Sequence, residues 1–186
     1  MCGIFGIITS ADSHYSEQFL TKALIKLAVL SQSRGKDSSG LCAFNQESEK
    51  IEVVKGPIPA KELLSKPDTK KIISSAFRKT HKSRYAFGHA RLVTNGTQLN
   101  DENNQPIIKD GIVGVHNGIV TNVDELWEKH KDISREYEID TEVMLALVRD
   151  DLIKFKSVIK STSNAIKEVY GTVASAMVIN DYSNFI

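Results

Sequence analysis

The chain has 186 residues, a length that allows one domain with a hydrophobic core. Its formal net charge is +1 and its composition is ordinary for a globular protein, so no binding to nucleic acid or to an anionic membrane surface is expected. No apolar run reaches the roughly 18 residues that indicate a membrane-spanning helix.

The N-terminal half predicts strands and one long helix. Residues 2–8 are a short apolar run with β-branched side chains, typical of a buried strand. Apolar residues recur at helical spacing over residues 16–30. Residues 41–44 and 51–54 are expected to form a hairpin, and residues 85–89 a further strand.

Residues 55–84 are rich in lysine and arginine and contain only two acidic residues, Glu62 and Asp68. Two interpretations stay open for this segment. It is either a helical insertion whose charges face water, or a docking surface for an acidic partner or polyanion.

The next part of the chain predicts a strand at residues 111–116. Asn122 followed by Glu125 is a variant of the capping box. This pair predicts that a helix begins there and ends near residue 130.

The C-terminal part predicts two helices and a strand. Asp140 or Thr141 is expected to cap a helix over residues 142–149. Residues 152–169 have the pattern of an amphipathic helix, and residues 172–179 alternate as a strand does. Strands and helices are mixed without regular alternation, which favours antiparallel sheets layered with helices, an α+β architecture.

The two cysteines, Cys2 and Cys42, come with no sign of secretion, so free thiols and a cytoplasmic location are expected. Zinc-site spacings, a Walker A loop and a dinucleotide fingerprint are missing from the sequence. Neither a metal nor a cofactor is therefore expected.

Five short motifs carry residues suited to chemistry. They are Cys2-Gly3-Ile4-Phe5-Gly6, Arg34-Gly35-Lys36-Asp37-Ser38-Ser39-Gly40, Gly88-His89-Ala90-Arg91-Leu92-Val93-Thr94-Asn95-Gly96, His116-Asn117-Gly118-Ile119-Val120-Thr121-Asn122 and Asp140-Thr141-Glu142. In this order, and with cysteine at position two, they resemble the glutaminase domain of class II glutamine amidotransferases. That group includes glucosamine-6-phosphate synthase, amidophosphoribosyltransferase and asparagine synthetase.

The resemblance covers essentially the whole chain, so residues 1–186 are expected to be one glutamine amidotransferase type-2 domain. It implies the four-layer αββα sandwich of antiparallel sheets found in N-terminal nucleophile hydrolases. It also implies hydrolysis of L-glutamine to L-glutamate and ammonia through a thioester.

Cys2 is the candidate nucleophile. An α-amine has a reference pKa of about 7.7–8.0 and a free thiol one of about 8.5, so the amine of an N-terminal cysteine can accept the thiol proton and later give it to ammonia. This chemistry requires removal of Met1, which is expected because cysteine is small. Taken alone, Cys2 could instead be a small buried hydrophobic residue.

Asn117 and Gly118 suit an oxyanion hole, because an amide N–H₂ and a backbone N–H can converge on one oxygen. The resemblance assigns them this role. In isolation, Asn-Gly equally predicts a plain turn.

Arg91 is the candidate clamp for the α-carboxylate of glutamine, since a guanidinium matches a carboxylate with two hydrogen bonds. Asp140 is the candidate partner of the α-ammonium. The alternatives are a surface arginine for Arg91 and a helix cap for Asp140.

The remaining candidates are carried by the resemblance. Arg34 and Asp37 match a supporting loop near the nucleophile, with Arg34 on the thiol side. Thr94 and Gly96 match a loop that closes over glutamine, where Asn95 replaces the histidine of the sugar-phosphate members.

His89 and His116 raise the alternative of a cysteine–histidine pair. A strand histidine that is hydrogen-bonded in the core is favoured, because the α-amine makes an imidazole base unnecessary.

Relatives carry a second domain that uses the ammonia, and none fits within this chain. A synthetase or transferase partner, or a missing C-terminal domain, is therefore expected to accept the ammonia. The chain is expected to be either a domain trimmed at its C-terminus or a compact glutaminase acting in trans. Two other hypotheses stay open: hydrolysis of a different amide, and a glutamine-sensing or docking module with little turnover.

Overall fold

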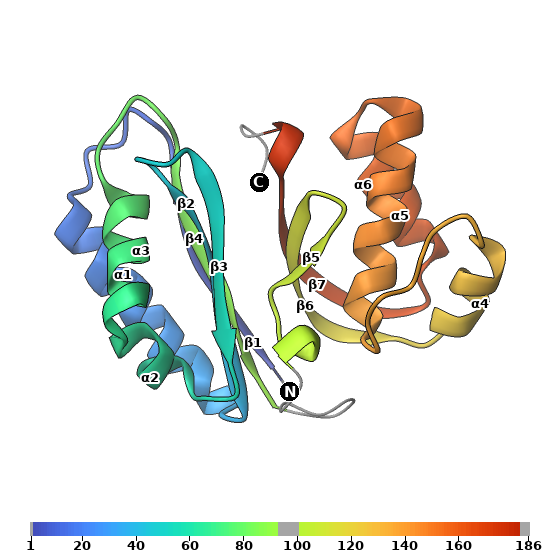
Figure 1. The fold of residues 1–186 in the computed structure, drawn as a ribbon, viewed down its shortest axis with the longest axis horizontal. Coiled ribbons are helices and arrows are strands. Elements are labelled where there is room, and N and C mark those ends of the chain that lie inside the picture. Colours follow the sequence, from blue (N-terminus) through green and yellow to red (C-terminus); the bar gives the residue numbers. More distant parts are fainter. Residues whose placement is uncertain (1, 93–100, 183–186) are drawn as a thin grey trace. The chain divides into compact units, whose positions relative to one another are not determined.

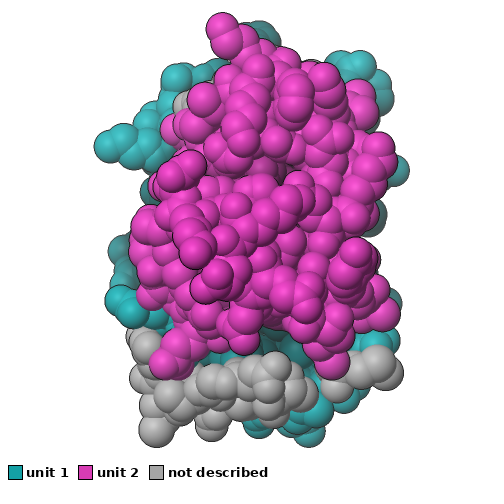
Figure 2. Space-filling view, turned by 90° about the vertical axis from the view of Figure 1, so that its right-hand side faces the viewer, with its two compact units in different colours: residues 1–106 teal, residues 107–186 magenta. Residues whose placement is uncertain are grey.

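The computed structural model describes residues 2–92 and 101–182 (Figure 1). The chain divides into two compact units, unit 1 at Met1–Pro106 and unit 2 at Ile107–Ile186, which Figure 2 shows in two colours. Each unit has its own antiparallel sheet and its own hydrophobic core. The expected α+β architecture is therefore present in both units.

Unit 1 contains a four-stranded antiparallel sheet in the order β1-β4-β2-β3. Its strands are β1 (Gly3–Thr9), β2 (Ser38–Asn45), β3 (Lys50–Gly56) and β4 (Arg84–Arg91). Its helices are α1 (Glu17–Ser31), α2 (Ala60–Ser65), α3 (Pro67–Phe77) and the short 3₁₀ helices η1 (Gln32–Arg34) and η2 (Asp101–Asn103). The predicted hairpin is confirmed, because β2 pairs with β3.

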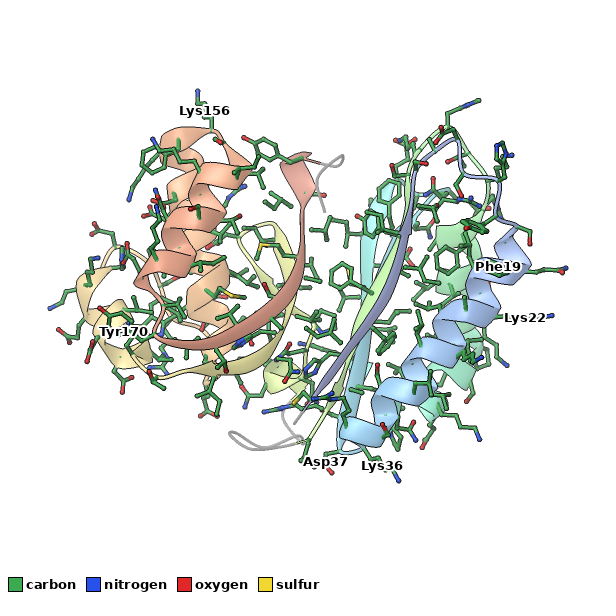
Figure 3. The ribbon with its side chains drawn as sticks, turned by 180° about the vertical axis from the view of Figure 1, so that it is seen from behind. Phe19, Lys22, Lys36, Asp37, Lys156 and Tyr170 are labelled. Carbon is green, nitrogen blue, oxygen red and sulfur yellow. The ribbon has the colours of Figure 1, made fainter. Side chains whose placement is uncertain are left out.

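Helix α1 follows the predicted periodicity. Ser16 caps its start by accepting a hydrogen bond from the Phe19 backbone N–H at 3.2 Å. Leu20, Leu24 and Ala28, each four residues apart, are its buried residues. They pack in the core of unit 1, on the face of the sheet that the helices cover (Figure 1), while Phe19 points away from the sheet (Figure 3).

The basic segment at residues 55–84 is an integral part of unit 1. It supplies α2 and α3, so the expected helical structure is present. Leu63, Ile73 and Phe77 are at most 1% exposed and join the core. The two helices therefore belong to the layer that covers the sheet, and the lysines lie on their outer side.

Unit 2 contains a three-stranded antiparallel sheet in the order β5-β6-β7. Its strands are β5 (Ile107–Lys109), β6 (Ile112–Val120) and β7 (Gly171–Ile179). Its helices are α4 (Val123–Lys129), α5 (Asp140–Phe155), α6 (Val158–Glu168) and the 3₁₀ helix η3 (Asn180–Tyr182). Residues 141–148 of α5 are all buried, because α5 packs against both the sheet and α6.

Two sequence-based predictions about this helical region are wrong. The break expected after residue 149 is absent, since α5 continues to Phe155 and ends at Lys156, which has a positive φ of 51°. An ion pair between Lys154 and Asp150, four residues apart, supports the extra turn. Asp140 does not cap this helix either: Ile139 occupies the cap position and Asp140 is the first helical residue.

The capping box at Asn122 is also wrong, although α4 begins at the next residue as predicted. The Asn122 side chain donates to the Glu168 carbonyl and accepts from the Tyr170 backbone N–H, both at 2.9 Å. Asn122 thus ties the end of β6 to the end of α6 and to the residues that follow it. None of the helices in the described part of the chain combines the length and apolarity that crossing a membrane requires.

Candidate active site

Cys2 directly precedes β1, and the pairing of Gly3 with Ala90 places it beside the end of β4. The residue is half-buried. Its thiol donates to the Leu92 carbonyl, with 3.5 Å between Sγ and the oxygen. The nucleophile candidate is therefore accessible at one end of the unit 1 sheet.

Arg34 contacts the main chain of Cys2. Its Nε donates to the Cys2 carbonyl oxygen at 3.0 Å. This hydrogen bond to the Cys2 carbonyl is a specific contact through which Arg34 can position Cys2.

The segment after Arg34 packs against the end of β4. The Asp37 backbone N–H donates to the Arg91 carbonyl at 3.0 Å, and Asp37 lies at the end of the sheet where β2 begins (Figure 3). A Cβ on Gly35 would lie 2.3 Å from the carbonyl carbon of Arg91. Only glycine therefore allows this close approach of two backbones.

Gly35→Ala is expected to lower the free energy of unfolding by about 1–3 kcal/mol, because the added methyl group overpacks the contact with Arg91. Gly56→Ala is the matched control, since its Cβ would meet nothing closer than Ile58 Cγ1 at 3.9 Å. Urea denaturation of both variants measures the difference. Equal stability of the two would show that the contact at Gly35 does not constrain the fold.

Arg91 is only 6% exposed, so the alternative of a surface arginine is wrong. Its Nη1 donates to the Asn103 carbonyl at 2.9 Å and to the Asn104 side-chain oxygen at 3.2 Å. These contacts hold the guanidinium in a defined orientation. The residues that bind it, Asn103 and Asn104, have no motif that would have revealed them in the sequence.

Cys2, Arg34, Asp37 and Arg91, here called the unit 1 group, thus lie together at one end of the unit 1 sheet. Thr94 and Gly96, together with Asn95, lie outside the described residues.

Asn117 and Gly118 lie inside β6 and pair with Ala174 and Val173 of β7. The turn interpretation is therefore wrong. Within the described residues the Asn117 side chain, which is half-buried, has no hydrogen-bond partner. Its amide N–H₂ is available to a ligand.

Position 118 must be glycine because β7 lies very close to it. A Cβ at this position would lie 1.9 Å from the Thr172 carbonyl oxygen and 2.6 Å from His116 Nε2. Any larger residue would push β7 away from β6.

The direction of the Gly118 backbone N–H follows from its neighbours. N–H groups two residues apart on a strand point to the same edge. The Thr121 N–H donates to the Tyr170 carbonyl on the β7 side, whereas the Val120 N–H donates to Asp140 Oδ2. The N–H of Gly118 therefore points to the same edge as that of Val120, where β5 pairs only with residues 112–114.

Asp140 is held close to this edge. Its Oδ2 accepts the Val120 N–H at 2.9 Å, and its Oδ1 lies 3.7 Å from His116 Nδ1. Burial would raise the pKa of Asp140, but the interactions with His116 and the Val120 N–H outweigh it and the pKa lies below its ordinary value. The carboxyl is therefore ionised at neutral pH, and its side chain is 24% exposed.

His116 is a buried strand histidine whose two ring nitrogens face Asp140 Oδ1 and, at 3.2 Å, the Thr172 carbonyl. The interpretation of a hydrogen-bonded core histidine is confirmed for this residue. His116 supports Asp140, which together with Asn117 and Gly118 is here called the unit 2 group. Its role as a support of Asp140 was missed from the sequence, although His116 directly precedes Asn117 in the same motif.

Cys42 lies in β2 and is completely buried. Burial raises the pKa of its thiol far above the usual range. The thiol is therefore protonated and inert at neutral pH, in contrast with the accessible Cys2. No cluster of three or more potential metal ligands occurs among residues 2–92 and 101–182.

A family model described as a glutamine amidotransferase domain matches residues 89–186. The glutamine–fructose-6-phosphate aminotransferase (isomerizing) of Buchnera aphidicola is 31% identical over 188 residues, which cover 99% of this chain and 27% of that protein. The protein of the same name from Sulfurisphaera tokodaii is 29% identical and covers 97% of this chain and 28% of its own length. The chain thus spans about a quarter of the length of these curated relatives.

Two solved structures show the same fold. A glutamine phosphoribosylpyrophosphate amidotransferase from B. subtilis, complexed with ADP and GMP, aligns with a TM-score of 0.69 and 22% identity over 96% of this chain and 35% of that chain. A structure described as the allosteric regulatory enzyme of purine biosynthesis aligns with a TM-score of 0.69 and 23% identity, over 96% of this chain and 36% of its own.

The family model matches more than half of the chain, so the chain belongs to the glutamine amidotransferase domain family. The resemblance to class II glutamine amidotransferases is thereby confirmed. The predicted α+β fold with antiparallel sheets is confirmed as well, because these two solved structures share it.

Proposed function

We propose that this chain carries out the glutaminase half-reaction of a class II amidotransferase, in which L-glutamine and water give L-glutamate and ammonia. The observation that carries the proposal is the placement of Cys2. The chain belongs to the glutamine amidotransferase family, and its half-buried Cys2 lies at the end of a sheet. Arg34 binds the backbone carbonyl of Cys2, and Arg91 lies on the neighbouring strand β4.

The reaction begins when the thiol of Cys2 loses its proton to the α-amine that removal of Met1 would expose. The sulfur attacks the amide carbon of glutamine, and the carbonyl oxygen takes up the negative charge. When the carbon–oxygen double bond forms again, the carbon–nitrogen bond breaks, and the amine returns the proton to the departing ammonia. Water then attacks the γ-glutamyl thioester and releases glutamate and the thiol.

The unit 2 group supplies the electrostatic part of the mechanism. The free amide of Asn117 and the backbone N–H of Gly118 are the donors for the oxyanion. Asp140 is ionised and partly exposed, so it is suited to bind the α-ammonium of glutamine. Arg91 is assigned to the α-carboxylate, and Asp37 supports it through the Arg91 main chain. Thr94 and Gly96 remain candidates for a loop over the substrate.

The ammonia would pass to an acceptor, either a synthetase or transferase partner or a further domain of a longer protein. The curated relatives are named as aminotransferases of fructose 6-phosphate and are about four times as long as this chain. A sugar-phosphate acceptor is therefore the first to test. A cytoplasmic location is proposed with it, because both thiols are free and Cys2 must stay reduced.

Incubation with a diazo-ketone analogue of glutamine, followed by peptide mass spectrometry, tests the proposal. One adduct is expected on Cys2 of protein that lacks Met1, and excess L-glutamine should prevent it. Cys42 is the internal control, because its buried thiol should be modified only after denaturation. Processed protein that forms no adduct on Cys2 and releases no ammonia would contradict the proposal and favour a glutamine-sensing module.

A further inference from the structure

Unit 2 contains a buried ion pair that the proposed mechanism does not use. Lys109, the last residue of β5, lies with its Nζ 3.2 Å from Glu142 Oε1 in α5. The side chain of Lys109 is 1% exposed and that of Glu142 is 0% exposed. Charged residues are almost never buried so completely unless they are paired.

The ammonium group of Lys109 is fully engaged by the segment that precedes α5. It donates to the Ser134 carbonyl at 2.8 Å and to Glu136 Oε1 at 2.6 Å, in addition to its contact with Glu142. Burial alone would lower the pKa of Lys109, but the hydrogen bonds and charges of Glu136 and Glu142 outweigh it and raise the pKa. Lys109 is therefore charged at neutral pH.

The carboxylate of Glu142 binds the same segment through its backbone. Its Oε1 accepts the Glu136 N–H and its Oε2 accepts the Tyr137 N–H, each at 2.7 Å. Glu142 is the third residue of α5, a position from which a glutamate often reaches back to the start of its helix. Here it reaches beyond the cap and fastens the chain before it.

Stability alone does not account for this arrangement. Removing two charges from water costs several kcal/mol per ion, and an apolar pair of the same shape often stabilises a fold as well or better. A buried pair with defined hydrogen bonds does, however, select one conformation of the backbone around it. The backbone selected here is the segment at residues 134–137, which leads directly into Asp140.

We propose that Lys109 and Glu142 are positioning residues for Asp140, which they hold at the place where it binds the α-ammonium of glutamine. This inference rests on the function proposed above. Asp140 is two residues before Glu142 in the first turn of α5 and is tied on its other side to the Val120 N–H. The ion pair holds the backbone of Asp140 at the start of α5, and the Val120 N–H of β6 holds its carboxylate.

The consequence is a specific effect on recognition of the α-ammonium. Without Lys109, Glu142 would be a buried carboxylate with no ammonium partner, and the segment before α5 would move to let water reach it. Asp140 would then lose its position relative to β6. Binding of the amide and of the α-carboxylate, which depends on other residues, would change much less.

Two chromogenic substrates separate this effect from a general loss of structure. L-γ-glutamyl p-nitroanilide has the α-ammonium, and glutaric acid mono-p-nitroanilide lacks it. The measured quantity is the ratio of their kcat/KM values. For Lys109→Met this ratio is expected to fall at least about tenfold, mainly through KM of the first substrate, because a misplaced counter-ion weakens its binding. Asp140→Asn gives the reference value of this ratio when the contact between the Asp140 carboxylate and the substrate α-ammonium is lost completely.

Matched variants complete the design. Lys129→Met removes the exposed member of an ion pair with Glu168 in the same unit and should leave the ratio unchanged. In the double variant Lys109→Met with Glu142→Gln, the uncompensated charge is gone, so part of the ratio should return. Glu136→Gln, which removes a half-exposed partner of Lys109, serves if Lys109→Met does not fold, and its ratio should fall about two- to threefold.

The outcomes distinguish the two levels of inference. Equal losses of kcat/KM on both substrates in Lys109→Met, or an unchanged ratio in Glu136→Gln when only that variant folds, would overturn the positioning role. The proposed glutaminase function would be unaffected by that result, because it is tested on the wild-type protein. A wild-type protein that cleaves neither substrate and forms no adduct on Cys2 would overturn the proposed function itself, and the positioning role with it.

Discussion

Cys2→Ala is expected to lower the rate of ammonia release from L-glutamine by at least about 1000-fold, because alanine provides neither a nucleophile nor a route to the thioester. The variant should still fold, since within residues 2–92 and 101–182 the one hydrogen bond of the Cys2 side chain is the long one from Sγ to the Leu92 carbonyl at 3.5 Å. Steady-state ammonia production by protein that lacks Met1 measures the effect. Binding of glutamine, followed by calorimetry, should change little.

Cys42→Ala is the matched control for this experiment. Cys42 is completely buried in β2, so the variant is expected to lose about 1 kcal/mol of stability, by analogy with other small core truncations, and to keep its activity. If Cys2→Ala retained a tenth of the wild-type rate, another residue would have to be the nucleophile. If Cys42→Ala lost activity while remaining folded, the assignment of the two thiols would have to be reversed.

The elements that were predictable from the sequence are those whose periodicity reflects a one-sided environment. Helix α1 buries Leu20, Leu24 and Ala28 on one face and exposes the other, so its bounds were found within one residue. Helix α5 is buried on every side over residues 141–148, so no periodic pattern marked its end. Strand β5 has three residues and is too short to give a pattern at all.

In the candidate site, too, some features were predictable from local sequence and others were not. The motifs supplied candidates whose side chains have specific chemistry, such as Cys2, Asn117 and Asp140. They did not reveal the contacts between distant segments, because a tie such as that from Asn122 to Glu168 and Tyr170 spans 46 or 48 residues of sequence. Local rules therefore assigned to Asn122 and Asp140 the caps of their own helices, whereas tertiary partners had bound both side chains.

Asn117→Ala is expected to lower kcat for glutamine hydrolysis by about 100- to 1000-fold with a much smaller change in KM, because an oxyanion donor acts mainly as charge develops on the oxygen. Its side chain is half-buried, so truncation should alter thermal unfolding little. Steady-state kinetics on the processed protein separate kcat from KM. Asn117→Asp should be at least as slow, because a carboxylate in this place repels the oxyanion.

Asn180→Ala is the control of the same chemistry, because Asn180 is exposed just after β7 and belongs to neither group of candidate residues. It should retain the wild-type kcat and KM. A raised KM with an unchanged kcat in Asn117→Ala would mean that Asn117 binds the ground state of glutamine. The backbone N–H of Gly118 would then be the remaining donor for the oxyanion on β6. Gly118→Ala cannot test this donor, because its Cβ would lie 1.9 Å from the Thr172 carbonyl oxygen. A backbone ester at position 118, which removes the N–H alone, is the suitable variant.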